Sequence, residues 1–438
     1  MKHKIRRFGI MLFAIILLSA SGAVYAQVPG PGGPYNSGFT VQNLTSTTAS
    51  CTIQLYDSSG NPDYTNSSVS IPGNGSYFLY VGGLSIDSDQ YSVVISCDQE
   101  VAAVANHTSS SGTAASYEGM SASEASNVLY APGFYNNYYG YYSNLVVQNA
   151  SSSSVSVTVE LFAPGNATAE DSVTKSIATP GQAVSFNYDE FTLSGTIYSA
   201  KITATGGDVA AVVNVWNASG ESYSYTPFSS GSTIAYAPVL MNYYYGFYTA
   251  LTVQNLGSSS TSVRVTYSNG TVSTKTVAAN SSQLWYTPNE ISTTGWLGSA
   301  KVESLDSQPI VVLVNEKGST DGRAASYTGF PSGSKTVNAP IVLKNYYGYS
   351  TSITCQNVGS GTADITVTYS NGATETKSNV AANGTALFYQ PNLSTLPNNF
   401  NGSATITSAE DIVCVVNENQ VSNSAVQDWL LTYGGIGQ

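Results

Sequence analysis

The residues of this chain that could support catalysis are few and poorly placed for it. Two adjacent carboxylates, as in Asp189-Glu190 and Glu410-Asp411, have the chemistry of a glycosidase acid–base pair. Both pairs are expected on exposed turns, and neither recurs at a matching position of the repeats described below. We therefore interpret them as solvated turn charges, and we expect no catalytic residues and no enzymatic activity.

The candidates for metal or nucleophilic chemistry are equally isolated. His107, in "ANHTSSSG", is the one histidine beyond the first 26 residues, and we expect it in a loop. A single histidine cannot form a zinc site or a Ser-His-Asp triad without partners. The stretch "DSSGNPD", from Asp57 to Asp63, lacks the spaced acids and the terminal glutamate of a calcium loop. The sequence therefore predicts no metal and no cofactor.

The four cysteines alternate with apolar residues, so each is expected to point to the apolar face of a strand. Positions that match Cys355 hold valine in the other repeats, and positions that match Cys414 hold alanine or valine. That replaceability favours a structural role over catalysis or metal binding. Two bridges within modules, Cys51–Cys97 and Cys355–Cys414, are the favoured interpretation in an exported chain. Two pairs of free buried thiols are the alternative.

Tyrosine is concentrated in a phrase that recurs as "YAPGFYNNYYGYYSNLVVQN", "YAPVLMNYYYGFYTALTVQN" and "NAPIVLKNYYGYSTSITCQN". Each copy places two tyrosines directly before a glycine. These tyrosine pairs are Tyr138-Tyr139, Tyr244-Tyr245 and Tyr346-Tyr347. Because glycine permits a bend or a bulge, strand phase does not tell which way the pairs point.

Three interpretations of the tyrosine pairs stay open at the level of sequence. Packing between successive modules is favoured, because a tyrosine can bury its ring and keep its hydroxyl in water. Recognition is the second, since Tyr with Asn, Ser and Gly is typical of adaptable binding surfaces. Self-association along strand edges is the third. The aromatic residues after the glycines, Tyr141, Phe247 and Tyr349, fall on the inward face and are expected to close the end of each core.

These phrases belong to a repeat that covers nearly the whole chain. A strand ending in Gln-Asn occurs at 41–43, 147–149, 253–255 and 355–357. Each copy also has an apolar run ending in Asn and a later tyrosine. The agreements predict four modules, with bounds at 27–128, 129–234, 235–336 and 337–438. The first module lacks the Ala-Pro and Tyr-Tyr-Gly elements, and we interpret it as a cap.

Within a module the apolar residues alternate with period two, as in half-buried strands. In "SVRVTYSNGTVSTKTV", Val263, Val265 and Tyr267 share one face, and Asn269-Gly270 marks a hairpin turn. The asparagine that ends each Gln-Asn strand is expected to cap a turn. This density of short strands predicts an all-β fold of four tandem immunoglobulin-like β-sandwich modules that abut closely.

The N-terminus carries the pattern of a secretory signal. Four basic residues precede an apolar run of 12 residues from Gly9 to Ala20, and Val24-Tyr25-Ala26 fits a cleavage site. The run is shorter than the ~20 residues of a membrane span, so an uncleaved anchor is the less favoured alternative. We expect residues 1–26 to be a signal peptide and the mature chain to be secreted or at the cell surface, without a membrane span.

The charge and composition of the chain indicate which kinds of partner it can bind. The formal net charge is −12, with 14 Lys and Arg against 26 Asp and Glu, which opposes binding to nucleic acid. Charged residues make up 9% of the chain, against roughly 25% in ordinary globular domains. The polar surface must therefore come from Ser, Thr, Asn, Gln and Tyr, which interact by hydrogen bonding and stacking.

A module that reads "AP…YYG[YF]…VQN…V-V-Y-NG…GSA…VVVN" resembles the tandem immunoglobulin-like, CARDB-like modules of exported bacterial surface proteins. The resemblance covers all four modules and implies display or adhesion. We therefore expect an exported, non-enzymatic structural or adhesive surface protein. The alternative is a carbohydrate-binding protein or an accessory arm of a secreted polysaccharide-active system. The expected partners are polysaccharide or other surface proteins, and self-association is a further option.

Overall fold

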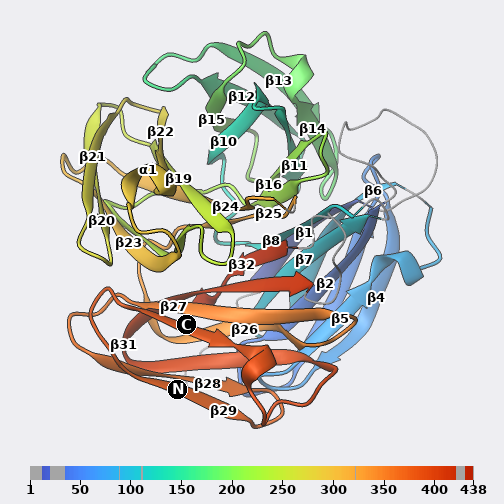
Figure 1. The fold of residues 1–438 in the computed structure, drawn as a ribbon. Helices are drawn as coiled ribbons and strands as arrows, with labels where there is room; N and C mark the ends of the chain where they lie inside the picture. Colours follow the sequence, from blue (N-terminus) through green and yellow to red (C-terminus); the bar gives the residue numbers. More distant parts are fainter. Residues whose placement is uncertain are drawn as a thin grey trace, which may run out of the picture.

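The computed structural model describes residues 12–19, 35–87, 89–109, 112–320, 322–420 and 430–437, and for residues 12–19 it describes the backbone alone. Among these residues nearly every regular element is a β-strand, and the strands pair in antiparallel fashion (Figure 1). The prediction of an all-β fold is confirmed. No helix in the described part of the chain is long and apolar enough to cross a membrane.

The third module shows the common plan most simply. Its elements are β18 (Ile234–Asn242), β19 (Phe247–Asn255), β20 (Thr261–Tyr267), β21 (Val272–Val277), β22 (Ser282–Tyr286), α1 (Thr287–Glu290), β23 (Trp296–Ser304), β24 (Ile310–Gly318) and β25 (Ala324–Thr328). One sheet has the order β18-β23-β20-β21 and the other the order β22-β19-β24-β25. Val263 and Val265 of β20 are fully buried and share one core with Leu251 of the opposite sheet. The period-two alternation therefore builds a sandwich.

The second and fourth modules repeat this plan with the two sheets joined. The second has β10 (Val128–Tyr138), β11 (Tyr141–Asn149), β12 (Val155–Phe162), β13 (Asp171–Ile177), β14 (Ala183–Asn187), η2 (Tyr188–Glu190), β15 (Ile197–Thr205), β16 (Val209–Asn217) and β17 (Ser222–Tyr225). The fourth has β26 (Ser334–Lys344), β27 (Tyr349–Asn357), β28 (Ala363–Tyr369), β29 (Thr374–Val380), β30 (Thr385–Tyr389), η3 (Gln390–Asn392), β31 (Phe400–Gln420), β32 (Leu430–Gly434) and β33 (Ile436–Gly437). In the second module β10 pairs with both β11 and β15, and in the fourth β31 runs through both sheets.

The first module takes its first strand from the N-terminal leader. Its elements are β1 (Leu12–Ser19), β2 (Tyr35–Asn43), β3 (Ala49–Tyr56), β4 (Pro62–Ile71), β5 (Ser76–Tyr80), η1 (Val81–Gly83), β6 (Gln90–Cys97), β7 (Val101–Ser109), β8 (Ala114–Glu118) and β9 (Met120–Ser121). The sheets have the orders β4-β3-β6-β1-β9 and β5-β2-β7-β8. The Ala-Pro strand that the first module lacks in sequence is thus replaced by residues 12–19, which the sequence analysis assigned to the signal peptide.

The strand order of a module shares two pairs with the immunoglobulin sandwich. The second strand lies beside the fifth and the third beside the sixth, as in that fold. The first strand, however, pairs with the sixth, and the seventh pairs with the second. The prediction of repeated β-sandwiches is therefore confirmed, but the strand order within each sandwich differs from that of the immunoglobulin fold.

The four modules close into a ring (Figure 1). The last long strand of each module lies near the centre, where β8 contacts β17 and β32, and β25 contacts the same two strands. Ser116 on β8 accepts a hydrogen bond from the backbone N–H of Thr432 at 2.8 Å, and Ser326 on β25 donates to the Ser224 carbonyl at 3.0 Å. The first module therefore contacts the fourth as well as the second. The sequence predicted contacts between successive modules and did not predict this contact between the first and the last.

A serine on the sixth strand fixes each successive junction. Ser199 donates to the carbonyl of Asn280 at 2.8 Å, and Ser299 donates to the carbonyl of Asn383 at 2.9 Å. Ser92 makes the matching bond to the Gly181 carbonyl. These serines are buried, so each bond satisfies a group that would otherwise be costly to bury. The junctions are therefore built by repeated side chains.

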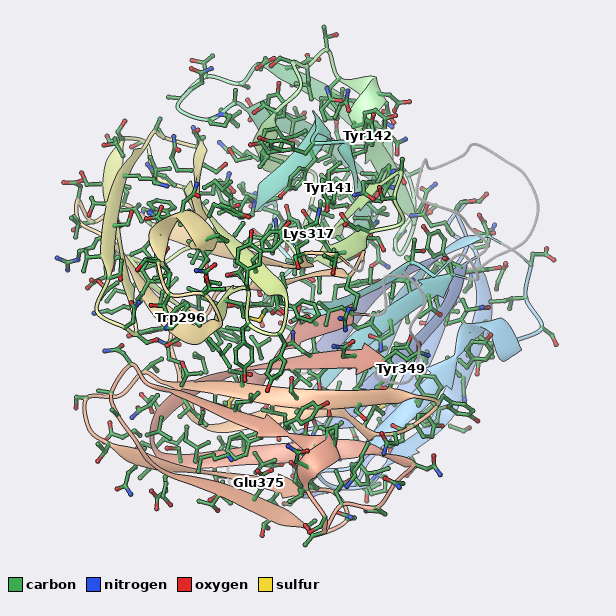
Figure 2. All side chains as sticks on the ribbon, in the orientation of Figure 1. Tyr141, Tyr142, Trp296, Lys317, Tyr349 and Glu375 are labelled. Atoms are coloured by element: carbon green, nitrogen blue, oxygen red, sulfur yellow. A yellow bond between two sulfur atoms is a disulfide. The ribbon has the colours of Figure 1, made fainter. Side chains whose placement is uncertain are left out.

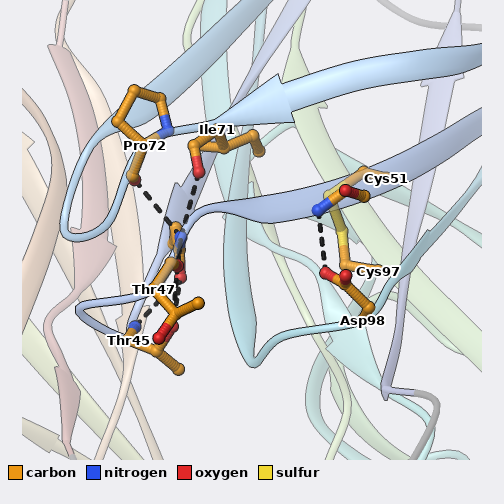
Figure 3. Close-up of a disulfide and its surroundings, with 9 residues drawn as sticks. Thr45, Thr47, Cys51, Ile71, Pro72, Cys97 and Asp98 are labelled. Carbon is orange, nitrogen blue, oxygen red and sulfur yellow. Dashed lines mark hydrogen bonds between the residues drawn. A yellow bond between two sulfur atoms is a disulfide. The ribbon is translucent and has the colours of Figure 1, made fainter.

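Both cysteine pairs form bridges. Cys51 is bonded to Cys97 across β3 and β6, and Cys355 is bonded to Cys414 across β27 and β31. No free cysteine is found among the described residues. These are the two pairings that strand phase favoured, and Figure 3 shows the first of them beside Asp98, whose carboxylate accepts a backbone hydrogen bond from Ser50 at 2.8 Å. Each bridge lies inside one module.

The asparagine that ends each Gln-Asn strand caps the following turn, as predicted. In the third module the Asn255 amide donates to the carbonyls of Ser259 at 2.7 Å and Val277 at 3.1 Å. Its side-chain oxygen accepts the backbone N–H of Gly257 at 2.9 Å. The same pattern in the first module closes the turn next to Thr45 and Thr47 in Figure 3. These asparagines are structural, because their polar atoms are used within the turn.

Candidate binding surface at the tyrosine hairpins

Three equivalent hairpins place a tyrosine in an unfavourable backbone conformation. Each hairpin joins the first and second strands of its module through a two-residue turn. The turns are Tyr139-Gly140, Tyr245-Gly246 and Tyr347-Gly348, which we call the tyrosine hairpins. The tyrosine φ angles are 50°, 48° and 47°, and the glycine φ angles are 79°, 83° and 86°. Positive φ at both positions is what a type I′ turn requires, and Asn-Gly is the usual sequence there.

The outer ring of each hairpin is open to solvent. Tyr139, Tyr245 and Tyr347 are 84%, 85% and 83% exposed. The favoured expectation that the pairs pack between modules is therefore wrong for these outer rings, because a packed ring would be covered. The reason is that the outer tyrosine lies in the turn itself, beyond the paired residues of both strands. This exposure is compatible with the two other interpretations, recognition and self-association.

The inner ring of each pair supports the outer one. Tyr138, Tyr244 and Tyr346 are half-buried and pack against the cores of their own modules. The inner and outer ring centroids of these pairs lie 4.6, 4.8 and 4.7 Å apart in edge-on contact. Burial raises the pKa of Tyr138 and of Tyr244, so these phenols stay neutral. The inner rings thus anchor the outer rings to the scaffold.

Further aromatic rings continue from the hairpin of the second module. Tyr142 lies 4.5 Å from Tyr188, and Tyr188 lies 6.3 Å from Trp216, between ring centroids. In the third module Tyr248 similarly lies 5.6 Å from Tyr243. Flat rings next to exposed hydroxyls suit stacking contacts, because they combine apolar area with hydrogen-bonding groups.

The residue after each hairpin glycine packs against the core end, as predicted for Tyr141, Phe247 and Tyr349. In the second module Tyr141 also donates to Glu221, and Lys317 of the third module lies 2.9 Å from that carboxylate. Figure 2 labels Tyr141 and Lys317, whose Nζ and hydroxyl are 3.0 Å apart. Burial and the Glu221 charge raise the pKa of Tyr141 well above its ordinary value. The hairpin base is therefore held by an ion pair across the module junction.

Two further carboxyl groups are buried at the module junctions. Glu316 is 1% exposed and lies within hydrogen-bonding reach of Asn417, and burial raises its pKa to about 8. Glu418 is 2% exposed, with Asn106 Nδ2 at 3.2 Å, and burial raises its pKa to about 7. Sequence reasoning missed both. Their partners lie in other modules, so no local pattern signals the contact.

Two of the residues that the sequence raised for chemistry, His107 and Glu190, make structural contacts. The expectation that His107 lies in a loop is wrong, because it lies in the strand β7. Its side chain is buried there and forms a hydrogen bond with Ser37 Oγ at 2.7 Å. Glu190 forms a capping box with Asn187 and an ion pair with Lys175. No group of three or more metal-ligating residues is found in the part of the chain that the structure describes.

Asp57 is likewise a turn residue. Its carboxylate accepts the backbone N–H groups of Ser59 at 2.9 Å and of Asn61 at 2.7 Å. Glu410 accepts the backbone N–H of Gly361 at 3.3 Å. Asp57 therefore acts as turn charge, as expected. The expectation of a turn is wrong for Glu410 and Asp411, because β31 runs unbroken from Phe400 to Gln420 and contains both residues.

The comparisons with known proteins place this chain in no family. No family model and no curated protein matches it. The Thermotoga maritima 1070 structure is 17% identical, covering 24% of this chain and 96% of its own, with a TM-score of 0.21. The Anabaena sensory rhodopsin transducer is 15% identical, covering 23% of this chain and 97% of its own, with a TM-score of 0.16. The CARDB-like resemblance is not confirmed by these matches.

Proposed function

We propose that this chain is an exported, non-enzymatic structural or adhesive protein that contacts its target through the tyrosine hairpins. One observation carries the proposal: three equivalent turns hold an exposed tyrosine where asparagine would fit the backbone better. A left-handed non-glycine residue costs roughly 1–2 kcal/mol. Strain of this kind collects at binding sites, where the side chain it presents is used.

Export is supported by the leader pattern and by the bridges. Disulfides form and persist in oxidising compartments outside the cytosol. The described part of the chain holds two such bridges, each within one module. The low charge of the chain leaves hydrogen bonding and stacking as its main means of contact.

Carbohydrate binding is the second candidate function. Tyr142 and Tyr188 favour it, because both rings are partly exposed and an exposed aromatic ring can stack on a sugar. Trp216 is buried and packs edge-on against Tyr188. Under this proposal the protein would be a polysaccharide-binding component or the accessory arm of a secreted polysaccharide-active system. The two candidates differ in the partner, and the rings of the second continue from the hairpin of the second module.

The test replaces all three outer tyrosines. In the triple variant Tyr139→Asn, Tyr245→Asn, Tyr347→Asn, the type I′ turns are kept and the rings are removed. We expect binding to immobilised cell-wall polysaccharide or to intact bacterial cells to fall at least tenfold, because several weak contacts act together. Binding is measured by pull-down and by surface plasmon resonance.

The matched control is Tyr80→Ser with Tyr389→Ser, which removes two tyrosines that are 46% and 40% exposed elsewhere on the surface. The control should bind as the parent protein does. Equal binding by the parent and the triple variant would refute the proposed role of the hairpins. A glycan array separates the two candidates, because specific sugar binding favours the carbohydrate function and its absence favours protein contacts.

A further inference from the structure

The strand β1 occupies the same position in the first module that the Ala-Pro strand occupies in the others. Ile16 is opposite Val93, as Ala131 is opposite Ala200 in the second module. On its other side β1 also pairs with β9, where Ile15 is opposite Met120. The corresponding bridges elsewhere are Tyr130–Phe228, Tyr236–Phe330 and Asn338–Ile436. The leader strand therefore fills a slot between β6 and β9, and in each of the other modules the first strand fills the equivalent slot.

The predicted cleavage after Ala26 removes this strand. The mature chain would then begin with "QVPGPGGP", residues 27–34, in which three of the eight residues are proline. Proline has no backbone N–H and cannot donate to a sheet ladder, so this segment is a poor replacement for β1. The slot between β6 and β9 is therefore left without a strand from its own module.

The empty slot would expose both hydrogen-bonding groups and apolar side chains. β1 pairs with β6 over eight residues, from Leu12–Cys97 to Ser19–Gln90. On β6, Tyr91, Val93 and Ile95 are fully buried when β1 is in place. An open strand edge next to apolar surface is a template for another strand. The Cys51–Cys97 bridge ties β6 to β3, so the edge keeps its position when β1 leaves.

We propose that the slot in the mature chain accepts an extended strand from a partner protein, by β-strand addition. This inference rests on the proposed export and cleavage of the leader. The seated leader strand shows the direction and the register that an occupant would take, antiparallel to β6. Backbone hydrogen bonds supply affinity in such complexes, and alternate side chains supply specificity.

The other modules define the chemistry of the occupant. In their first strands the inward residues are apolar and small to medium in size. These buried residues are Leu129 and Ala131, Ala235 and Ala237, and Val337 and Ala339. A late tyrosine completes the site, as Tyr327 donates to the Val239 carbonyl at 2.7 Å. The partner segment should therefore carry such residues at alternate positions and no charge on that face.

The test compares the mature chain, residues 27–438, with the chain that retains residues 1–26. The probe is a synthetic peptide of residues 334–344, "SKTVNAPIVLK", whose lysines keep it in solution. The control peptide carries Val337→Asp and Ala339→Asp, which places charge on the inward face. Hydrogen–deuterium exchange follows the β6 amides, and the melting temperature is recorded with each peptide.

We expect the β6 amides to exchange at least tenfold faster in the mature chain, and the probe alone to restore their protection and raise the melting temperature. Full protection of β6 in the mature chain without peptide would overturn the inference. So would a mature chain that dimerises with concentration and thereby protects β6, since a second copy would then be the occupant. Mass spectrometry of the exported protein separates the failures: a retained residue 1 would show that the leader is not cleaved.

Discussion

Raising the pH from about 5 to about 9 is expected to lower the free energy of unfolding by several kcal/mol, because Glu316 and Glu418 are buried as neutral acids. In the folded chain these carboxyl groups keep their protons up to pKa values of about 8 and about 7. In the unfolded chain they release them near the ordinary value of 4.5. Between these values the folded state binds more protons, so stability falls as pH rises.

The size of the pH effect follows from proton linkage. One proton of difference changes the free energy of unfolding by about 1.4 kcal/mol for each pH unit. The double variant Glu316→Gln, Glu418→Gln keeps neutral side chains at both positions at every pH and should reduce the slope of the pH profile. Glu118, whose pKa burial also raises, should account for part of the slope that remains. Urea unfolding at several pH values measures this. Glu160→Gln, on a partly exposed position of β12, is the control and should keep the parent slope.

An unchanged slope in the Glu316→Gln, Glu418→Gln variant would show that these carboxyl groups do not govern the pH dependence. Both carboxyl groups lie at contacts between modules, so their titration should also affect how the modules hold together. Glu316 meets Asn417 at the junction of the third and fourth modules, and Glu418 meets Asn106 where the fourth module meets the first. Loss of protons above pH 8 should therefore loosen the ring at these junctions before the module cores unfold.

Removal of the Cys355–Cys414 bridge is expected to cost about 4 kcal/mol on the loop-entropy model. The bridge joins residues 59 positions apart, on strands that are direct neighbours. The variant Cys355→Val, Cys414→Ala reproduces the Val147–Ala211 pair that occupies the same place in the second module. Because that pair packs well there, the substitution removes the covalent bond with little change to the core.

Denaturant unfolding, with and without a reducing agent, measures the loss in the free energy of unfolding of the fourth module. The parent protein should lose the same amount of stability on reduction of this bridge as through the substitution. A loss below about 1 kcal/mol would indicate that the denatured chain is compact enough to make the bridge redundant. The Cys51–Cys97 bridge remains in the variant and serves as an internal reference.

The sequence predicted the features that depend on local pattern. Alternation at Val263 and Val265 marked a strand, and the phase of the cysteines favoured the two bridges that are found. The capping role of Asn255 followed from its place at a strand end. Each of these depends on side-chain direction within one strand, which period-two geometry fixes.

The sequence did not predict the features that depend on contacts between modules. The Asn106–Glu418 contact joins residues 312 positions apart, and nothing near either residue signals it. The exposure of Tyr139 was also not predicted. The glycine after it allows a bend, so the alternation of the strand could not be continued to this residue. A type I′ turn could have been recognised from the glycine at its second position, although tyrosine is an unusual first residue.

The role of the outer tyrosines is tested most sharply by the free energy of unfolding of the variant Tyr139→Asn, Tyr245→Asn, Tyr347→Asn. If these tyrosines are kept for contact at a cost in backbone strain, the variant should be more stable than the parent, by up to about 1 kcal/mol for each hairpin, while binding is lost. A variant that is less stable than the parent would show instead that the exposed rings stabilise the fold and are not kept for contact.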